Sequence, residues 1–329
     1  MTPTPTEVSE EELIREHDEL GLPPVEEEVL HAEPTTGVLL RVISYLVIAV
    51  LVGLAAYFLL QLFVGRHERT GTQIVLAAVH DPMFWSAVGV GLLAQVIDGA
   101  LGMAYGVTSS SFLLAAGAPP LLASGATHLA EVFTTGISGI SHLKMGNVDR
   151  KLFLCLLLPG VTGGLLGTYV LSNVDGGLLK PWISAYLLLM GLYVLSKAFR
   201  RIVIVKKEIH AGRIVPLAVL GSFMDVTGGG GWGPIVTTSL VGAGHDPRTT
   251  IGSVNFAEFF LTVTVSAAFF SVLDASVWTL VAGLVIGGMF AAPFAAYITR
   301  HLKARLLLVL VGTLISAISA FNLWQTLAR

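Results

Sequence analysis

A polar motif occurs twice in the apolar part of this chain, 127 positions apart, and the two copies align without a gap. Asp98 matches Asp225, Gly106 matches Gly233, and ten of the 34 aligned positions from 98 to 131 are identical. Each copy places a carboxyl group and helix-breaking glycines inside an apolar segment, where both are costly. Costly features that recur at matching positions of two repeats are typical of a transport site.

The composition indicates a membrane protein. Of 329 residues, 54% are hydrophobic and only 12% are charged, with a mean hydropathy of +0.78. Soluble domains carry roughly twice that charged fraction. We therefore expect an all-α polytopic membrane protein. The one cysteine, Cys155, rules out an intrachain disulfide and a cysteine-based metal cluster.

Apolar runs divide the chain into a tail, an extra span and two sets of five segments. We expect an acidic, largely disordered tail over 1–36, with a short helix at 10–20, and an extra transmembrane helix over 37–65. The first repeat covers 84–199, a basic connector 200–213, and the second repeat 214–326. The segments are predicted near 84–103, 106–118, 121–143, 152–172 and 181–199, and near 214–229, 232–243, 249–272, 277–298 and 304–325.

Basic residues predict the orientation of these segments. They gather at 144–151, at 197–213 and at 300–305. If the N-terminus is cytoplasmic and every segment crosses, all three clusters lie on the cytoplasmic side, as the positive-inside rule requires. Because each set has an odd number of segments, the two repeats are predicted to be inverted relative to each other. The second segment of each set is too short for a full crossing, so whether it crosses or re-enters stays open.

The glycine elements predict helix breaks that bind an anion. Four glycines before Trp232-Gly233-Pro234 cannot continue a helix cheaply, whereas proline suits the first turn of a new one. The free amides and the dipole of such a helix N-terminus attract anions. Close packing of small residues is the structural alternative. The candidate substrate-binding residues are Gly102, Tyr105, Gly106, Thr108, Ser109, Gly229, Gly230, Gly231, Trp232, Gly233 and Asn255.

Titratable residues accompany these breaks. His128 and Glu131 are three residues apart and share a helix face, as do Asn255 and Glu258 in the second copy. A buried carboxyl can gain or lose a proton, and histidine titrates near neutral pH. The candidates for proton coupling are Asp98, His128, Glu131, Asp225 and Glu258. The alternative is that these side chains only brace the broken helices by accepting bonds from free amides.

The pattern resembles the TauE/SafE sulfite exporter family. The resemblance covers roughly 86–326 and rests on the glycine cluster Gly228–Pro234 and on the basic loop His142–Arg150. It implies export of a small sulfur-containing anion such as sulfite, thiosulfate, a sulfonate or sulfoacetate. The first glycine element, Asp98-Gly99-Ala100-Leu101-Gly102, lacks the triple glycine common in relatives, and the tail and first span are additions.

We therefore expect a proton-linked anion transporter of the bacterial inner membrane that works by alternating access. Its partners are the anion, the lipid bilayer and protons; no cofactor, metal or nucleic acid is expected, and the oligomeric state is open. An anion channel could use the same glycine amides. An intramembrane hydrolase would need Ser109, Ser110 or Ser111 with His128 or His142, but no nucleophile elbow is present.

Overall fold

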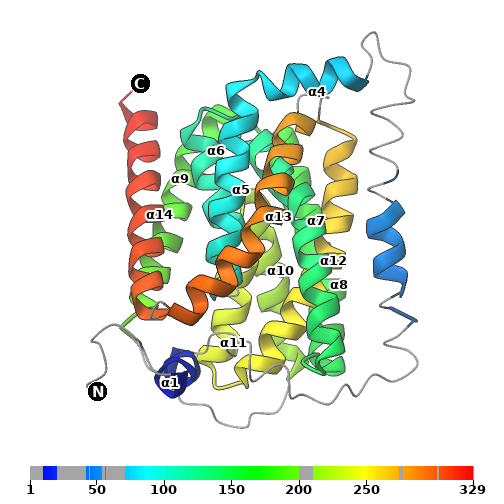
Figure 1. Cartoon of the computed structure of the whole chain (residues 1–329), viewed down its shortest axis with the longest axis vertical. Helices are drawn as coiled ribbons and strands as arrows, with labels where there is room; N and C mark the ends of the chain where they lie inside the picture. Colours follow the sequence, from blue (N-terminus) through cyan, green and yellow to red (C-terminus); the bar gives the residue numbers. More distant parts are fainter. Residues whose placement is uncertain are drawn as a thin grey trace, which may run out of the picture.

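The computed structural model describes residues 10–20, 42–43, 45–53, 56, 71–101, 103–199, 210–273, 277–301 and 304–328. This part of the chain folds into a bundle of helices, and strands are absent from it (Figure 1). The helices are α1 Glu10–Leu20, α4 Gly71–Val79, α5 Pro82–Leu101, α6 Tyr105–Ala115, α7 Pro120–Lys144, α8 Arg150–Asn173, α9 Gly176–Lys197, α10 Ala211–Gly228, the π-helical turn η1 Gly233–Thr237, α11 Thr238–Gly242, α12 Pro247–Phe270, α13 Val277–His301 and α14 Ala304–Leu327.

Local sequence signals fix where the long helices begin. Asp149 and Asp246 cap α8 and α12 by accepting bonds from Leu152 N and Thr249 N, each at 2.8 Å. Asp175 caps α9 in the same way. A carboxylate at this position satisfies amides that the helix leaves without an acceptor. The helix ends therefore fall within a few residues of the ten predicted segments, and α1 occupies the range predicted for the tail helix.

The second segment of each set does not cross the bundle. Helix α5 descends from one end of the bundle to Leu101, and helix α6, which begins at Tyr105, returns to that end (Figure 1). Helices α10 and α11 form the matching hairpin from the opposite end. The second segment of each set therefore turns back at the break, which is one of the two arrangements that the sequence left open. Since the two segments return as a pair, the predicted sidedness of all later loops is unchanged.

The two sets pack on each other in matching pairs. Gly283 and Gly287 of α13 lie against Phe84 and Val88 of α5, so these helices run in the same direction. Their counterparts α8 and α10 do the same, as Gly163 lies against Val219 and Gly167 against Phe223. A side chain at Gly163, Gly283 or Gly287 would overlap the facing helix, and one at Gly167 would press against it. Small residues thus allow close helix approach, as is usual in membranes.

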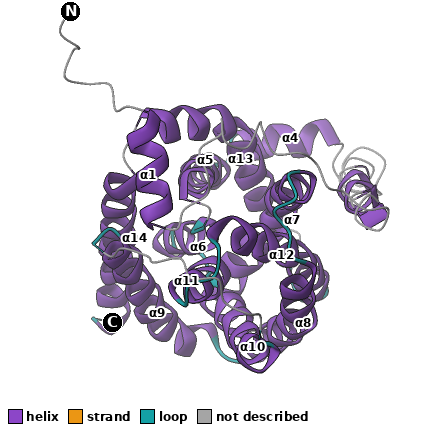
Figure 2. Cartoon of the chain, turned by 90° about the horizontal axis from the view of Figure 1, so that it is seen from below, coloured by secondary structure: helices purple, strands orange, loops and turns teal. Residues whose placement is uncertain are grey.

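Helices α7 and α12 cross antiparallel at the centre of this arrangement. The hydroxyl oxygens of Thr135 and Thr262, which are equivalent residues of the two repeats, lie 3.5 Å apart. Contact between equivalent residues on antiparallel helices is what a two-fold axis through this point would produce. This geometry supports the predicted inverted repeat. Seen from below, the half-helices α6 and α11 lie in the middle, with longer helices around them (Figure 2).

The outer faces of the long helices are apolar. Trp182 is 76% exposed and Leu158 is 72% exposed, and many other large apolar side chains share this position. In the described part of the chain, four helices are long and apolar enough to cross a bilayer: 150–173, 176–197, 247–270 and 305–327. A lipid environment accounts for these exposed side chains. The protein is thus a multi-pass membrane protein.

Most of the described lysine and arginine residues gather at one end of the bundle, which we call the basic end; Lys180, near the start of α9, lies at the other. Helix α1 lies there, as do the junction of α7 with α8, the end of α9, the start of α10 and the start of α14 (Figure 1). Arg305 of α14 forms ion pairs with Glu16 and Glu19 of α1 at 3.6 and 3.1 Å. Most of the tail, most of the extra span at 37–65 and most of the connector at 200–213 lie outside the described residues.

Candidate transport site

Each of the two repeated aspartates bridges a helix break. Asp98 of α5 accepts a bond from the backbone amide of Tyr105 at 3.3 Å, and Asp225 of α10 accepts one from Trp232 at 3.0 Å. In both cases the amide lies seven residues further along and opens the next half-helix. A carboxylate there satisfies a free donor and favours the positive end of the helix dipole. The bracing role considered for these residues is therefore present in the geometry.

The glycine run lets the two breaks touch. Gly229, Gly230 and Gly231 have φ angles of +77°, +142° and +154°, which favour glycine over other residues. A Cβ added at Gly106 would lie 2.8 Å from the Cα of Gly230. Tyr186 of α9 holds the run in place by donating to the Gly230 carbonyl at 2.9 Å. The breaks thus face each other at the middle of the bundle.

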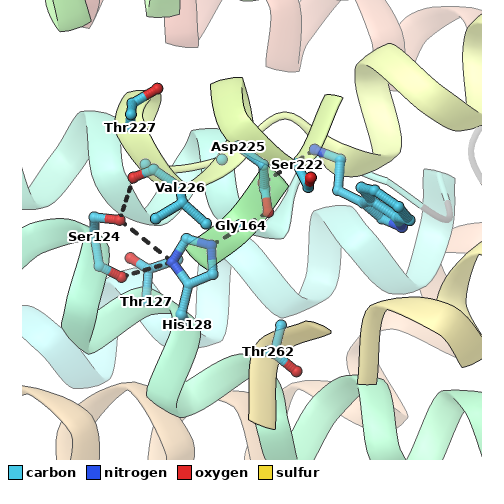
Figure 3. A network of polar contacts seen from close by, with 12 residues as sticks. Ser124, Thr127, His128, Gly164, Ser222, Asp225, Val226, Thr227 and Thr262 are labelled. Carbon is cyan, nitrogen blue, oxygen red and sulfur yellow. Dashed lines mark hydrogen bonds and ion pairs between the residues drawn. The ribbon is translucent and has the colours of Figure 1, made fainter. Parts of the chain in front are cut away.

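His128 joins α7 to the second break. Its Nδ1 lies 2.8 Å from the Ser124 carbonyl oxygen, and its Nε2 lies 3.2 Å from Oδ2 of Asp225 (Figure 3). A carbonyl only accepts, so Nδ1 carries a hydrogen. A proton must then sit between Nε2 and Asp225, on one atom or the other. The sequence placed His128 on the same helix face as Glu131; the hydrogen-bond partner of its Nε2 is Asp225, because α10 packs against this face of α7.

Ser124, His128 and Asp225 follow one another like a catalytic triad, but the site has the geometry of a structural network. Oγ of Ser124 donates to the Val226 carbonyl at 2.7 Å and lies 3.3 Å from Nδ1 of His128. Ser124 and His128 are buried and are not part of the cavity wall described below. Of the hydrolase candidates, Ser110 donates to the Gly229 carbonyl and Ser111 to the Val107 carbonyl. The hydroxyls of Ser110 and Ser111 are therefore hydrogen-bonded to backbone carbonyl groups.

A small cavity of about 20 Å³ lies between the two breaks. Its wall contains four carboxyl-bearing residues, two from each repeat: Asp98, Glu131, Asp225 and Glu258. Glu131 is 3% exposed and one of its carboxyl oxygens has no hydrogen-bond partner. The other lies beside Gly106 at the start of α6. A cavity of this size holds about one water molecule.

The cavity brings together most of the predicted site. Its wall includes the predicted residues Tyr105, Gly106, Gly231, Trp232, Gly233 and Asn255 together with the four carboxyl groups. Thr108, Ser109, Gly229 and Gly230 lie outside the wall. Gly102 lies outside the described residues. Asn255 does not pair with Glu258; its amide donates to Ser138 at 3.1 Å.

Sequence reasoning missed several residues of the wall. Thr134 and Thr135 line the cavity one helical turn beyond Glu131, a spacing that could have revealed them. Ala104 also lines it and has a φ angle of +100°, rare for a residue with a side chain. Its repeat partner is Gly231, so the alignment marks the position. Lys197 was assigned to the basic connector, but its side chain is buried.

Comparison with known proteins identifies the family. Residues 87–322 match the family model for the sulfite exporter TauE/SafE. The chain belongs to the TauE/SafE family. The probable membrane transporter protein YtnM of Bacillus subtilis is 45% identical over 242 residues, which cover 71% of this chain and 80% of that protein. The probable membrane transporter protein YunE of the same organism is 23% identical over 262 residues, covering 68% and 94%. No solved structure matches the chain.

This TauE/SafE protein is thus a membrane transporter, and the matched region contains both broken hairpins and the whole cavity wall. The extra span and the acidic tail precede the matched residues. The family's description points to a small anion as the substrate, which agrees with the predicted recognition of an anion by helix N-termini.

Proposed function

We propose that this protein exports a small sulfur-containing anion (sulfite, thiosulfate, a sulfonate or sulfoacetate) across the bacterial inner membrane. The observation that carries the proposal is the cavity between two broken hairpins, which combines helix N-termini with four carboxyl groups. The basic end then faces the cytoplasm, as the positive-inside rule requires, and the N-terminal tail with it.

The helix N-termini supply the binding groups for the anion. The first turns of α6 and η1 reach the cavity at Gly106 and Gly233, where a helix offers no internal acceptor for its amides. Trp232 and Tyr105 flank these turns, and the buried Trp232 indole is fixed by a bond to the Val254 carbonyl at 3.2 Å. An oxyanion of three or four oxygens suits such converging donors.

Proton linkage follows from the carboxyl groups. An ionised carboxylate repels an anion in the same small cavity, and in a low dielectric that repulsion is strong. The anion is therefore expected to bind when protons occupy the site, so the two move together. The His128–Asp225 pair holds one such proton, and Glu131 has an unpartnered oxygen facing the cavity region.

The opposed entry of the two hairpins is the geometry that alternating access requires. The hairpin α5–α6 enters from one end and α10–α11 from the other, so rocking one repeat against the other opens either end in turn. Gradients of the anion, the proton and the membrane potential set the net direction. A channel would instead pass anions continuously, which current recording in voltage-clamped bilayers distinguishes from coupled flux.

Replacing Glu131 by glutamine tests the proton linkage. Glutamine keeps the size of the side chain but cannot exchange a proton. In proteoliposomes loaded with the labelled anion, wild-type flux should fall as pH rises, because a proton must accompany the anion. We expect Glu131→Gln to flatten that pH profile. The control is Glu11→Gln in α1, an exposed position remote from the cavity.

Flux of the Glu131→Gln variant with unchanged magnitude and pH profile would remove Glu131 from the coupling mechanism. If the Glu11→Gln control changed the profile to the same extent, the effect would not be specific to the cavity. Wild-type vesicles that carry none of the four anion classes would contradict the proposed function itself.

A further inference from the structure

A buried lysine lies directly beside the two helix breaks. Lys197 is in the last turn of α9 and is 5% exposed. Its ammonium nitrogen is 3.2 Å from the sulfur of Met103 and 3.4 Å from Oγ1 of Thr238. Met103 belongs to the first break and to the cavity wall, and Thr238 is the first residue of α11. The Lys197 side chain therefore connects α9 to the first break and to α11, next to the central cavity.

The partners of Lys197 do not balance its charge. A thioether sulfur and a hydroxyl are neutral, and the sulfur is a weak acceptor. Among the described residues, the ion pairs join His128 to Asp225 and Arg305 to Glu16 and Glu19; none includes Lys197. Burying a cation without an anionic partner is costly. Such a group is retained where an anion meets it.

The surroundings of Lys197 lead from the breaks toward the basic end. Ser239, the neighbour of Thr238, lines a second cavity of about 310 Å³. That cavity lies between the start of α10 and the end of α11, and its wall includes His210, Arg213 and His245. Positively charged and protonatable side chains raise the local concentration of an anion. Thr237, next to Thr238 on the other side, has a buried hydroxyl without a partner.

We propose that Lys197 forms an inner subsite for the transported anion, between the cavity at the basic end and the central cavity. The ammonium pairs with the oxyanion, and the hydroxyl of Thr238 donates beside it. This inference rests on the proposed function and adds a residue that selects for negative charge. The structural alternative is that Lys197 only stabilises the C-terminus of α9 through the helix dipole.

The test compares Lys197→Met with Lys197→Arg and with Lys151→Met. Methionine keeps the unbranched chain and removes the charge; Lys151 is exposed at the same end and provides a matched loss of one charge. Flux of labelled sulfite, thiosulfate and a sulfonate is measured in proteoliposomes over a range of concentrations. We expect Lys197→Met to raise the half-saturating concentration at least about tenfold, Lys197→Arg to restore most of the affinity, and Lys151→Met to match the wild type.

The amount of monodisperse protein and its thermal midpoint in detergent provide the second readout. A subsite predicts that Lys197→Met folds normally and saturates poorly. An unchanged half-saturating concentration, or a lower yield of folded protein with normal saturation, would overturn the proposal. If the wild type transports no member of the panel, the proposed function fails; if the wild type transports and Lys197→Met saturates normally, only the subsite fails.

Discussion

Gly230→Ala is expected to abolish transport and to reduce the yield of folded protein sharply. Gly230 has a φ angle of +142°, and a Cβ there would overlap the backbone of Gly106 and Val107. The strained backbone costs about 1–3 kcal/mol for a residue with a side chain. The overlap cannot relax by a rotamer change, because backbone faces backbone. The two breaks would therefore separate, and the cavity between them would lose its geometry.

Two other glycines provide matched controls for this substitution. Gly117 has a φ angle of +94° but open space around its Cβ position, so Gly117→Ala carries the strain without the overlap. Gly212 in the first turn of α10 has neither feature. Flux and folded yield measured in parallel should follow the order Gly212→Ala, Gly117→Ala, Gly230→Ala, from least to most affected. A Gly230→Ala protein with wild-type flux would show that contact between the breaks is dispensable.

Asp225→Ala is expected to reduce flux below detection, whereas Asp225→Asn should fold and lose its normal pH dependence. Alanine leaves the Trp232 amide and Nε2 of His128 without their partner, at about 1–3 kcal/mol for each buried group. Asparagine can replace both contacts: its oxygen accepts from the amide of Trp232, and its NH₂ donates to Nε2 of His128. It cannot exchange a proton. The pair of variants therefore separates bracing of the helix break from proton coupling.

The equivalent aspartate of the first repeat is the control. Asp98 accepts from the Tyr105 amide, and no histidine contact to it is seen in the described structure. We expect Asp98→Asn to change the pH profile of flux less than Asp225→Asn does. Flux at several pH values and thermal midpoints in detergent are the measurements. If Asp225→Asn keeps the wild-type pH profile, Asp225 acts only as a helix cap.

Much of the fold could be predicted from local sequence features. The lengths of the apolar segments predicted the positions of the long helices, and the glycine run before Pro234 predicted the break between α10 and η1. The alignment of the two repeats predicted a matching break in the first repeat, where there are fewer glycines. Prolines at matching positions also start α7 and α12. These signals are local, because helix initiation and termination depend on a few neighbouring residues.

The pairing of side chains across helices could not be predicted in the same way. Helical spacing placed His128 near Glu131, but spacing cannot show which other helix covers that face. Because α10 packs on α7, Nε2 of His128 lies within hydrogen-bonding distance of Asp225. Lys197 was grouped with neighbouring basic residues that follow it in the chain, whereas the end of α9 turns it toward Met103. Neither contact could be predicted from the sequence, because tertiary contacts join residues that are far apart in it.

Flux in proteoliposomes under an imposed pH gradient tests the central claim most directly. Vesicles containing the purified protein are given labelled sulfite, thiosulfate, sulfate or a sulfonate, with the membrane potential clamped, with and without a pH difference. We expect at least one sulfur-containing anion to be transported, and we expect the gradient to drive it from the acidic to the alkaline side beyond equilibrium. Transport of none of these anions, or flux that is the same with and without the gradient, would contradict that claim.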